Sequence, residues 1–150
     1  MKTKICVVLM FAAGLLSLPA LADVPGRHPA FLHALTDLRD ARWNLEHREG
    51  DSAARMNEDA AIAEVDRAIE EIRQAAVDDG KNLNVHPRED ARLDRPGRLH
   101  RSLELLRKAR SDASGEEDNP ATRGLRHRAL EHIDAAIRAT EHALHDLERR

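Results

Sequence analysis

Apolar residues along most of the chain recur every three or four positions, which is the spacing of an amphipathic α-helix. No segment alternates apolar and polar residues with period two, so the pattern predicts an all-helical protein. We expect one helix from Pro29 until Gly50, a second from the N-cap residue Asp51 until Gly80, a third from about Pro96 to Ser114, and a fourth after Asn119-Pro120. The expected core positions are Phe31, Ala34, Leu35, Leu38, Ala41, Leu45, Ile62, Val65, Ile69, Ile72, Ala76, Leu99, Leu103, Leu106, Ala109, Ala113, Leu130, Ile133, Ile137, Thr140, Leu144 and Leu147.

The chain also matches itself when it is shifted by 68 residues. The identical pairs include Leu35/Leu103, Leu38/Leu106, Arg39/Arg107, Ala41/Ala109, Arg42/Arg110, Ala61/Ala129, Asp66/Asp134, Ala68/Ala136 and Ile69/Ile137. We interpret this as a duplicated helical hairpin, with repeats at about 28–80 and 95–148 and a long loop at 81–94. Such a loop is either functional or a solvated linker. The expected fold is all-α: an antiparallel four-helix bundle whose helices alternate in direction along the chain.

Two repeated arginines occupy positions that the apolar stripes would otherwise use. Arg42 and Arg110 are hypothesised to reach acids on a neighbouring helix, Asp66 and Asp134, which repeat as well. Many other acids precede a base at helical spacing, and we interpret these as solvated, ion-paired helix faces. The functional alternative is that such a face binds a partner.

The first 22 residues have the pattern of a cleaved signal peptide. Lys2 and Lys4 precede a short apolar run, and Ala20-Leu21-Ala22 supplies small residues before the expected cleavage. An uncleaved anchor is the alternative, but the run is shorter than the ~20 residues that span a bilayer. The mature domain is then 23–150, periplasmic or secreted, without a stable membrane anchor. Cys6 is the only cysteine, so this domain has no disulfide and no thiolate metal ligand.

Charge and aromatic content exclude further classes. The whole chain has 27 acidic and 24 basic residues, and loss of the signal leaves a net charge of about −5, which argues against a nucleic-acid partner. Phe31 and Trp43 are the only aromatic rings beyond the signal, too few for a stacking platform.

The nine histidines suggest a different chemistry. If the helices alternate in direction, His28, His33, His86, His100, His142 and His145 meet at the end of the bundle that holds the long loop. Imidazole is a common ligand of Cu, Ni and Zn, and His142 and His145 share one helix face. His33 with Asp37 and His100 with Glu104 add carboxylates at helical spacing. The predicted metal site has His33, His86 and His100 at its core, with His28, His142 and His145 as helpers; for each pair, an ordinary surface contact is the alternative.

The segment Ala129-Leu130-Glu131-His132-Ile133-Asp134-Ala135-Ala136-Ile137 and its counterpart, residues 61–69, resemble repeats of small periplasmic metal-binding proteins. That family consists of cysteine-free, histidine-containing four-helix bundles that take up divalent metals such as copper and nickel. The resemblance covers the second and fourth helices and implies a metal-binding role for His132. Residues 61–69 contain no histidine, unlike that family's repeats.

Enzyme signatures are missing from the sequence. No histidine follows a glutamate by three positions as in di-iron bundles, and there is no His-Glu-x-x-His, nucleophile elbow or glycine-rich phosphate loop. The sequence therefore favours a soluble periplasmic binding protein without catalytic residues, with a divalent metal as the most concrete ligand. The alternative is a structural or protein-interaction module of the cell envelope with no metal.

Overall fold

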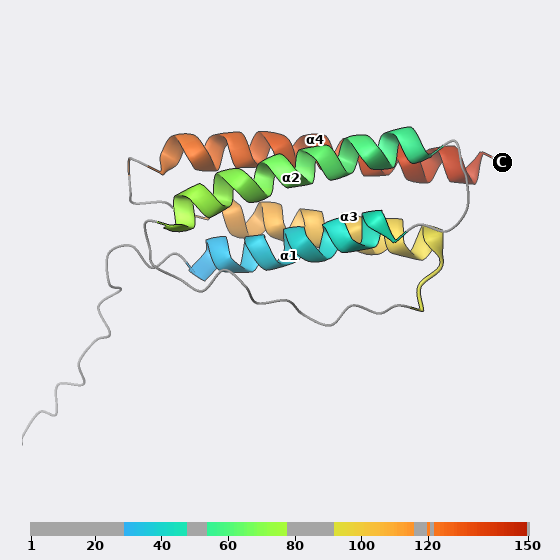
Figure 1. Cartoon of the computed structure of the whole chain (residues 1–150), viewed down its shortest axis with the longest axis horizontal. Coiled ribbons are helices and arrows are strands. Elements are labelled where there is room, and N and C mark those ends of the chain that lie inside the picture. Colours follow the sequence, from blue (N-terminus) through green and yellow to red (C-terminus); the bar gives the residue numbers. More distant parts are fainter. Residues whose placement is uncertain (1–28, 48–53, 78–91, 116–119, 121, 150) are drawn as a thin grey trace, which may run out of the picture.

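The computed structural model of the chain describes residues 29–47, 54–77, 92–115, 120 and 122–149. These residues form four α-helices and no strand: α1 (Pro29–Glu46), α2 (Arg55–Val77), α3 (Arg95–Ala113) and α4 (Arg123–Glu148). The all-helical prediction is confirmed. The helices pack as a bundle of two layers, with α1 beside α3 and α2 beside α4 (Figure 1). The expected signal peptide and most of the expected loop lie outside the described residues.

The direction of each helix follows from the residues that meet between helices. Ser102 in α3 donates to the backbone carbonyl of Ala41 in α1, whereas Lys108, later in α3, contacts Asp37, earlier in α1. The two helices of this layer therefore run in opposite directions.

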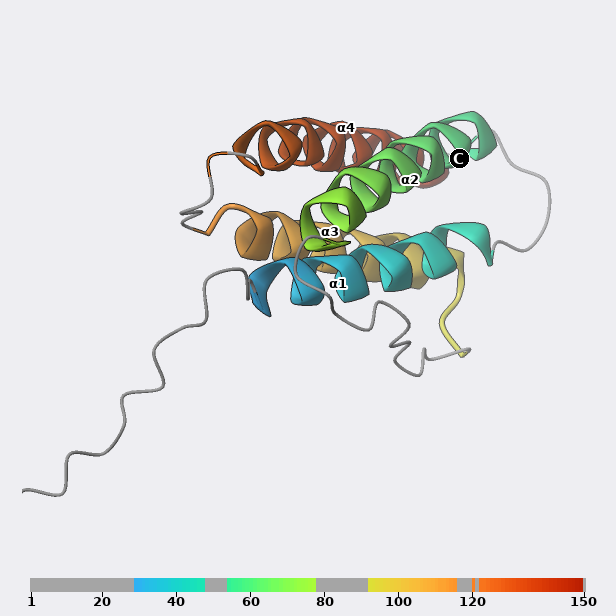
Figure 2. The ribbon, with the colours of Figure 1, turned by 60° about the vertical axis from the view of Figure 1, so that its left-hand side comes forward.

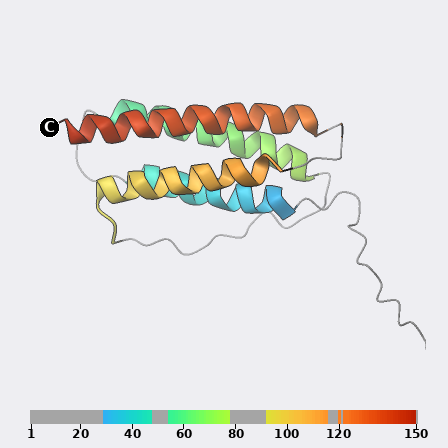
Figure 3. The same cartoon turned by 180° about the vertical axis from the view of Figure 1, so that it is seen from behind.

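The second layer and the connection between the layers are read in the same way. Asn57 near the start of α2 contacts Asp146 near the end of α4, whereas Glu71 contacts Arg128. Because α3 and α4 also oppose each other, α1 and α4 run one way and α2 and α3 the other (Figures 1 and 3). The expected alternation of direction along the chain is thus wrong at α3, which begins at the end of the bundle opposite the end of α2.

The start of α3 shows how local sequence sets a helix boundary. Asp94 has an extended backbone conformation, and its side chain accepts a hydrogen bond of 2.8 Å from the backbone N–H of Gly97, as an N-cap residue does. Pro96 follows in the first turn, where its missing N–H costs nothing. A Cβ on Gly97 would lie 2.8 Å from the same Asp94 oxygen, so a larger residue there would displace the capping carboxylate.

The core confirms the predicted positions on α1 and α3, and on α2 and α4 it confirms Val65, Ile72, Ile133 and Thr140. The predicted apolar residues of α1 and α3 are all buried. On α2 and α4, by contrast, Ile62, Ile69, Leu130 and Ile137 lie only at the edge of the core. The alanine that precedes each of them in the chain is fully buried instead.

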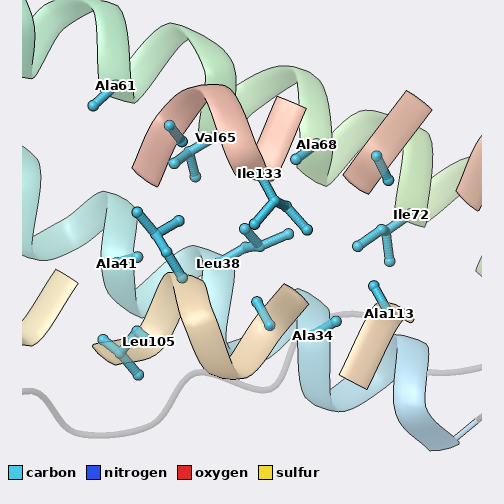
Figure 4. Close-up of a cluster of buried hydrophobic side chains, with 14 of the residues drawn as sticks. Ala34, Leu38, Ala41, Ala61, Val65, Ala68, Ile72, Leu105, Ala113 and Ile133 are labelled. Carbon is cyan, nitrogen blue, oxygen red and sulfur yellow. The ribbon is translucent and has the colours of Figure 1, made fainter. Parts of the chain in front are cut away.

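The buried alanines of α2 and α4 recur every seven residues and give the two helices a narrow contact face. They are Ala61, Ala68 and Ala75 in α2, and Ala129, Ala136 and Ala143 in α4, each with at most 1% of its surface exposed. Small side chains at this spacing let two helices approach closely, and α2 packs most extensively against α4 (Figures 2 and 4). Ser102 and Ala109 in α3 face Ala34 and Ala41 in α1 in the same manner.

The predicted ion pairs of the repeated arginines are confirmed. Arg42 Nε donates to Asp66 Oδ1 at 2.5 Å between α1 and α2. Arg110 Nε donates to Asp134 Oδ1 at 2.5 Å between α3 and α4. Both pairs are largely exposed, so each adds little to stability, but both fix the same register within a hairpin.

Candidate functional site

The structure separates the core of the predicted metal site. His33 lies near the start of α1, whereas His100 lies near the start of α3, at the other end of the bundle (Figure 1). Ser102 is level with Ala41 across the α1–α3 contact, so His33 and His100 are about 15 Å apart along the helix axes. One ion cannot bind both rings. His28 and His86 lie outside the described residues.

The remaining histidines of that prediction are not assembled into a site either. His100 shares its end of the bundle with His142 and His145 near the end of α4. Within the described ranges, however, no three His, Cys, Asp or Glu side chains are grouped so that they could hold a metal ion. The expected carboxylate partners are also engaged elsewhere, because Asp37 accepts hydrogen bonds from Lys108 and Glu104 pairs with Arg101.

His132 lies between α2 and α4, where it contacts an acid. Its Nδ1 is 2.7 Å from Glu64 Oε2, and the same carboxylate also pairs with Arg67. Glu64 and His132 are separated by 68 residues, so they occupy equivalent positions of the two repeats. This pair marks the centre of the contact between the hairpins.

Two turns along α2 from Glu64, a second carboxylate is paired with α4. Arg128 donates two hydrogen bonds of 2.8 Å to Glu71, and these bonds with the charge of Arg128 outweigh the effect of burial and hold the pKa of Glu71 below its usual value. A carboxyl group whose pKa is lowered by folding stabilises the protein above its unfolded pKa, about 4.3, and loses that effect as the pH falls through the folded pKa.

We therefore expect Glu71→Gln to lower the free energy of unfolding at pH 7 by a few tenths of a kcal/mol, because the pair is partly exposed. The difference from the unmodified protein should vanish at about pH 3. Urea unfolding at pH 7, 5 and 3 measures it. A difference that is the same at all three values would contradict this account.

The two hairpins differ in charge at several positions that match under the 68-residue shift, and one of these differences lies where the two helices of a hairpin meet. In the second hairpin, Arg107 Nη2 of α3 is 2.9 Å from Glu141 Oε1 of α4. In the first hairpin, the equivalent residues are Arg39 of α1 and Arg73 of α2. An ion pair in one repeat is thus replaced by two positive charges in the other. We call Arg39 and Arg73 the arginine pair.

The electrostatics of the arginine pair reflect this replacement. Partial burial and the positive charge of Arg73 lower the pKa of Arg39. One turn away, hydrogen bonds to Asp66 raise the pKa of Arg42. Arg39 also makes another contact within the protein. What sets the arginine pair apart from Arg107 and Glu141 is that its two charges, one on α1 and one on α2, have the same sign. An anion placed between them would relieve the repulsion.

A second cluster of polar side chains lies at the end of α1. His47 stacks on Trp43 with ring centroids 3.9 Å apart, and the Arg98 guanidinium lies 5.1 Å from the centre of the Trp43 ring. Close by in the bundle, Glu58 and Arg95 form a buried ion pair. Because these contacts use ring surface and charge within the protein, the cluster fits a structural role.

Sequence reasoning missed the arginine pair. The spacing of Glu70 and Arg73 is that of an ordinary ion pair on a solvated helix face, and it gives no sign that Arg73 lies near Arg39. The signal that would have found it is the 68-residue alignment, in which Arg39 matches an arginine while Arg73 matches Glu141.

No described helix is long and apolar enough to cross a membrane. No protein-family model matches the chain, and neither does a curated protein or a solved structure. The function is therefore inferred from the arrangement of the residues.

Proposed function

We propose that the protein is an exported, non-enzymatic interaction module whose first hairpin binds an acidic side chain of a partner protein in the cell envelope. The arginine pair carries this proposal. At equivalent positions, the second hairpin places a glutamate against its arginine, whereas the first hairpin places a second arginine there. At the position where the second hairpin carries an anion, the first hairpin thus carries a second cation.

The second hairpin also indicates which anion fits. There, the group that meets the arginine is a glutamate carboxylate at hydrogen-bond distance. Guanidinium groups bind carboxylates through planar, charge-assisted hydrogen bonds, and two of them can hold one carboxylate from both sides. Arg73 is exposed and Arg39 is half-buried, so a side chain from another protein can approach from the solvent. An aspartate or glutamate of a partner is the ligand that this arrangement favours.

The rest of the proposal concerns the scaffold. We take the chain to be an antiparallel bundle built from a duplicated hairpin, with a cleaved signal peptide that delivers it to the periplasm. The recurrence of the Arg42–Asp66 pair as Arg110–Asp134 supports the duplication. After duplication, one copy could keep the structural ion pair while the other changed its acid to Arg73 and gained a binding surface.

Divalent-metal binding through histidines ranks below this proposal. Its core residues His33 and His100 are at opposite ends, and no three-ligand group exists among the residues with described positions. His132, the residue to which the family resemblance assigns a metal-binding role, is paired with Glu64.

The test is to give the first hairpin the ion pair of the second. We expect Arg73→Glu to abolish partner binding and to stabilise the fold by about 0.5 kcal/mol, because a repulsive pair becomes an exposed ion pair. The unmodified protein and the variant are compared in chemical cross-linking with envelope extract, and in titrations with a glutamate-rich peptide. Loss of binding with a gain in stability separates a lost site from a damaged fold.

Two control variants sharpen the test. Arg123→Glu makes the same change of net charge at an exposed arginine outside the pair and should leave binding intact. Glu141→Arg creates a second arginine pair and should add a binding site for the peptide. If Arg73→Glu and Arg123→Glu weaken binding equally, only the net charge matters and the site is wrong.

A further inference from the structure

The ion pairs between the two hairpins share a polarity. Three ion pairs and one histidine–carboxylate contact join described residues of the two hairpins, and in each of the four the acid belongs to the first hairpin and the base to the second. The pairs are Asp37–Lys108, Glu58–Arg95, Glu64–His132 and Glu71–Arg128. The first hairpin is not acidic throughout, since it also contributes the base Arg42 to an internal ion pair with Asp66. The contact between the hairpins thus has an acidic face and a basic face.

The contact of Glu64 with His132 shows that the charges oppose pairing between two like hairpins. Because equivalent residues meet there, the two hairpins are related by an approximate twofold axis, and either hairpin has the shape to pair with a copy of itself. If two first hairpins paired in this register, Glu64 would face another Glu64. Asp37 natively pairs with Lys108, and the residue of the first hairpin that matches Lys108 is Asp40. Two first hairpins would therefore place Asp37 against Asp40, and both aspartates are buried.

Pairing of two second hairpins is opposed in the same way. Glu58, the native partner of Arg95, is equivalent to residue 126, so Arg95 would face Arg126. The Arg95 side chain is only 11% exposed, which makes a like charge opposite it costly. Arg128 would face Ala139 and lose its carboxylate partner. Both self-pairings therefore replace native ion pairs by repulsive or unpaired charges.

We propose that the two hairpins are a mutually selective pair: the acidic face of a first hairpin binds the basic face of a second hairpin, from its own chain or from a second copy, and rejects its own kind. In a duplicated protein this polarity prevents copies from associating through like hairpins. The selection acts where the two hairpins meet, mainly between α1 and α3 and between α2 and α4, and it does not involve the arginine pair, which joins the two helices of the first hairpin.

The proposal is tested on the full chain with three charge variants of the α2–α4 contact. The acidic face is made basic by E64K/E71R, the basic face is made acidic by H132E/R128E, and the third variant combines all four changes. We expect each double variant to melt about 5 °C or more below the unmodified protein, and the fourfold variant to return to its melting temperature as a monomer. Circular dichroism and light scattering measure both quantities.

A mixture of the double variants tests partner choice between chains. Each has two faces of like charge, so its own hairpins repel, but the basic first hairpin of one fits the acidic second hairpin of the other. We expect an equimolar mixture to form a two-chain species with recovered helicity, even if each variant alone is unfolded. If the double variants melt like the unmodified protein, or if the fourfold variant is no more stable than they are, the proposal is wrong.

Discussion

Replacing Arg95 by alanine is expected to lower the free energy of unfolding by about 3 kcal/mol. Arg95 donates to both oxygens of Glu58, at 2.9 and 2.5 Å, and Glu58 is only 1% exposed. Removing the arginine takes a positive charge and two hydrogen bonds away from a carboxylate that water cannot reach, and such a loss costs far more at a buried carboxylate than at an exposed one. Urea unfolding followed by the fluorescence of Trp43 measures the loss.

A matched variant separates burial from the mere loss of an ion pair. Arg110→Ala also removes an arginine from an arginine–carboxylate pair, but the side chains of that pair are 49% and 36% exposed. It should cost no more than about 1 kcal/mol. A double variant with methionine at both residue 58 and residue 95 should lie closer to the unmodified protein than Arg95→Ala, because it leaves no buried charge. Equal losses for Arg95→Ala and Arg110→Ala would show that water reaches the Glu58 carboxylate.

Much of the fold follows from local patterns, and these are legible in one sequence. The spacing of apolar residues identified four helices, and the predicted end of the second helix at Gly80 lies close to the observed Val77. The fourth helix begins at Arg123, three residues after the expected Pro120. The pairing of Arg42 with Asp66 was also predictable, because it repeats at Arg110 and Asp134 and two independent coincidences are improbable.

The sequence did not predict the direction of α3. The predicted metal site depended on that direction, because it required His33 and His100 to lie at the same end of the bundle. Periodicity gives the face that a helix buries, but a helix reversed end for end presents the same face. The long segment between the hairpins is compatible with either direction, since about fourteen extended residues can span the length of such a helix. The interhelical contacts decide the matter, and they place His33 and His100 at opposite ends.

The arginine pair illustrates a different limit. A repeat shows where two copies agree, and agreement is where structure is preserved. The proposed binding site lies instead where the two halves differ in charge at a position that is in contact, as at Arg73 and Glu141. To recognise this difference, one must know that Arg73 lies near Arg39 and that Glu141 contacts Arg107. A helix pattern alone does not say which residues meet across a hairpin.

The second large effect is expected from Ala68→Leu, which should lower the free energy of unfolding by about 3 kcal/mol. Ala68 is completely buried in the α2–α4 contact, where alanine recurs every seven residues on both helices (Figure 4). Leucine there adds three carbon atoms between helices that are spaced for methyl groups, so either the side chain adopts a strained rotamer or the helices move apart. Helix propensity contributes little, since alanine and leucine are both strong helix formers.

Ala63→Leu is the matched control, because it makes the same substitution five residues earlier in α2 at an exposed position. It should change stability by no more than about 0.5 kcal/mol. The equivalent variant in α4, Ala136→Leu, should match Ala68→Leu, since the two alanines are related by the repeat. Thermal unfolding of the three variants decides between packing and propensity. If Ala68→Leu were as stable as Ala63→Leu, the close approach of small residues would not be what holds the hairpins together at the α2–α4 contact, and the distance between α2 and α4 would have to be set by the larger side chains around them.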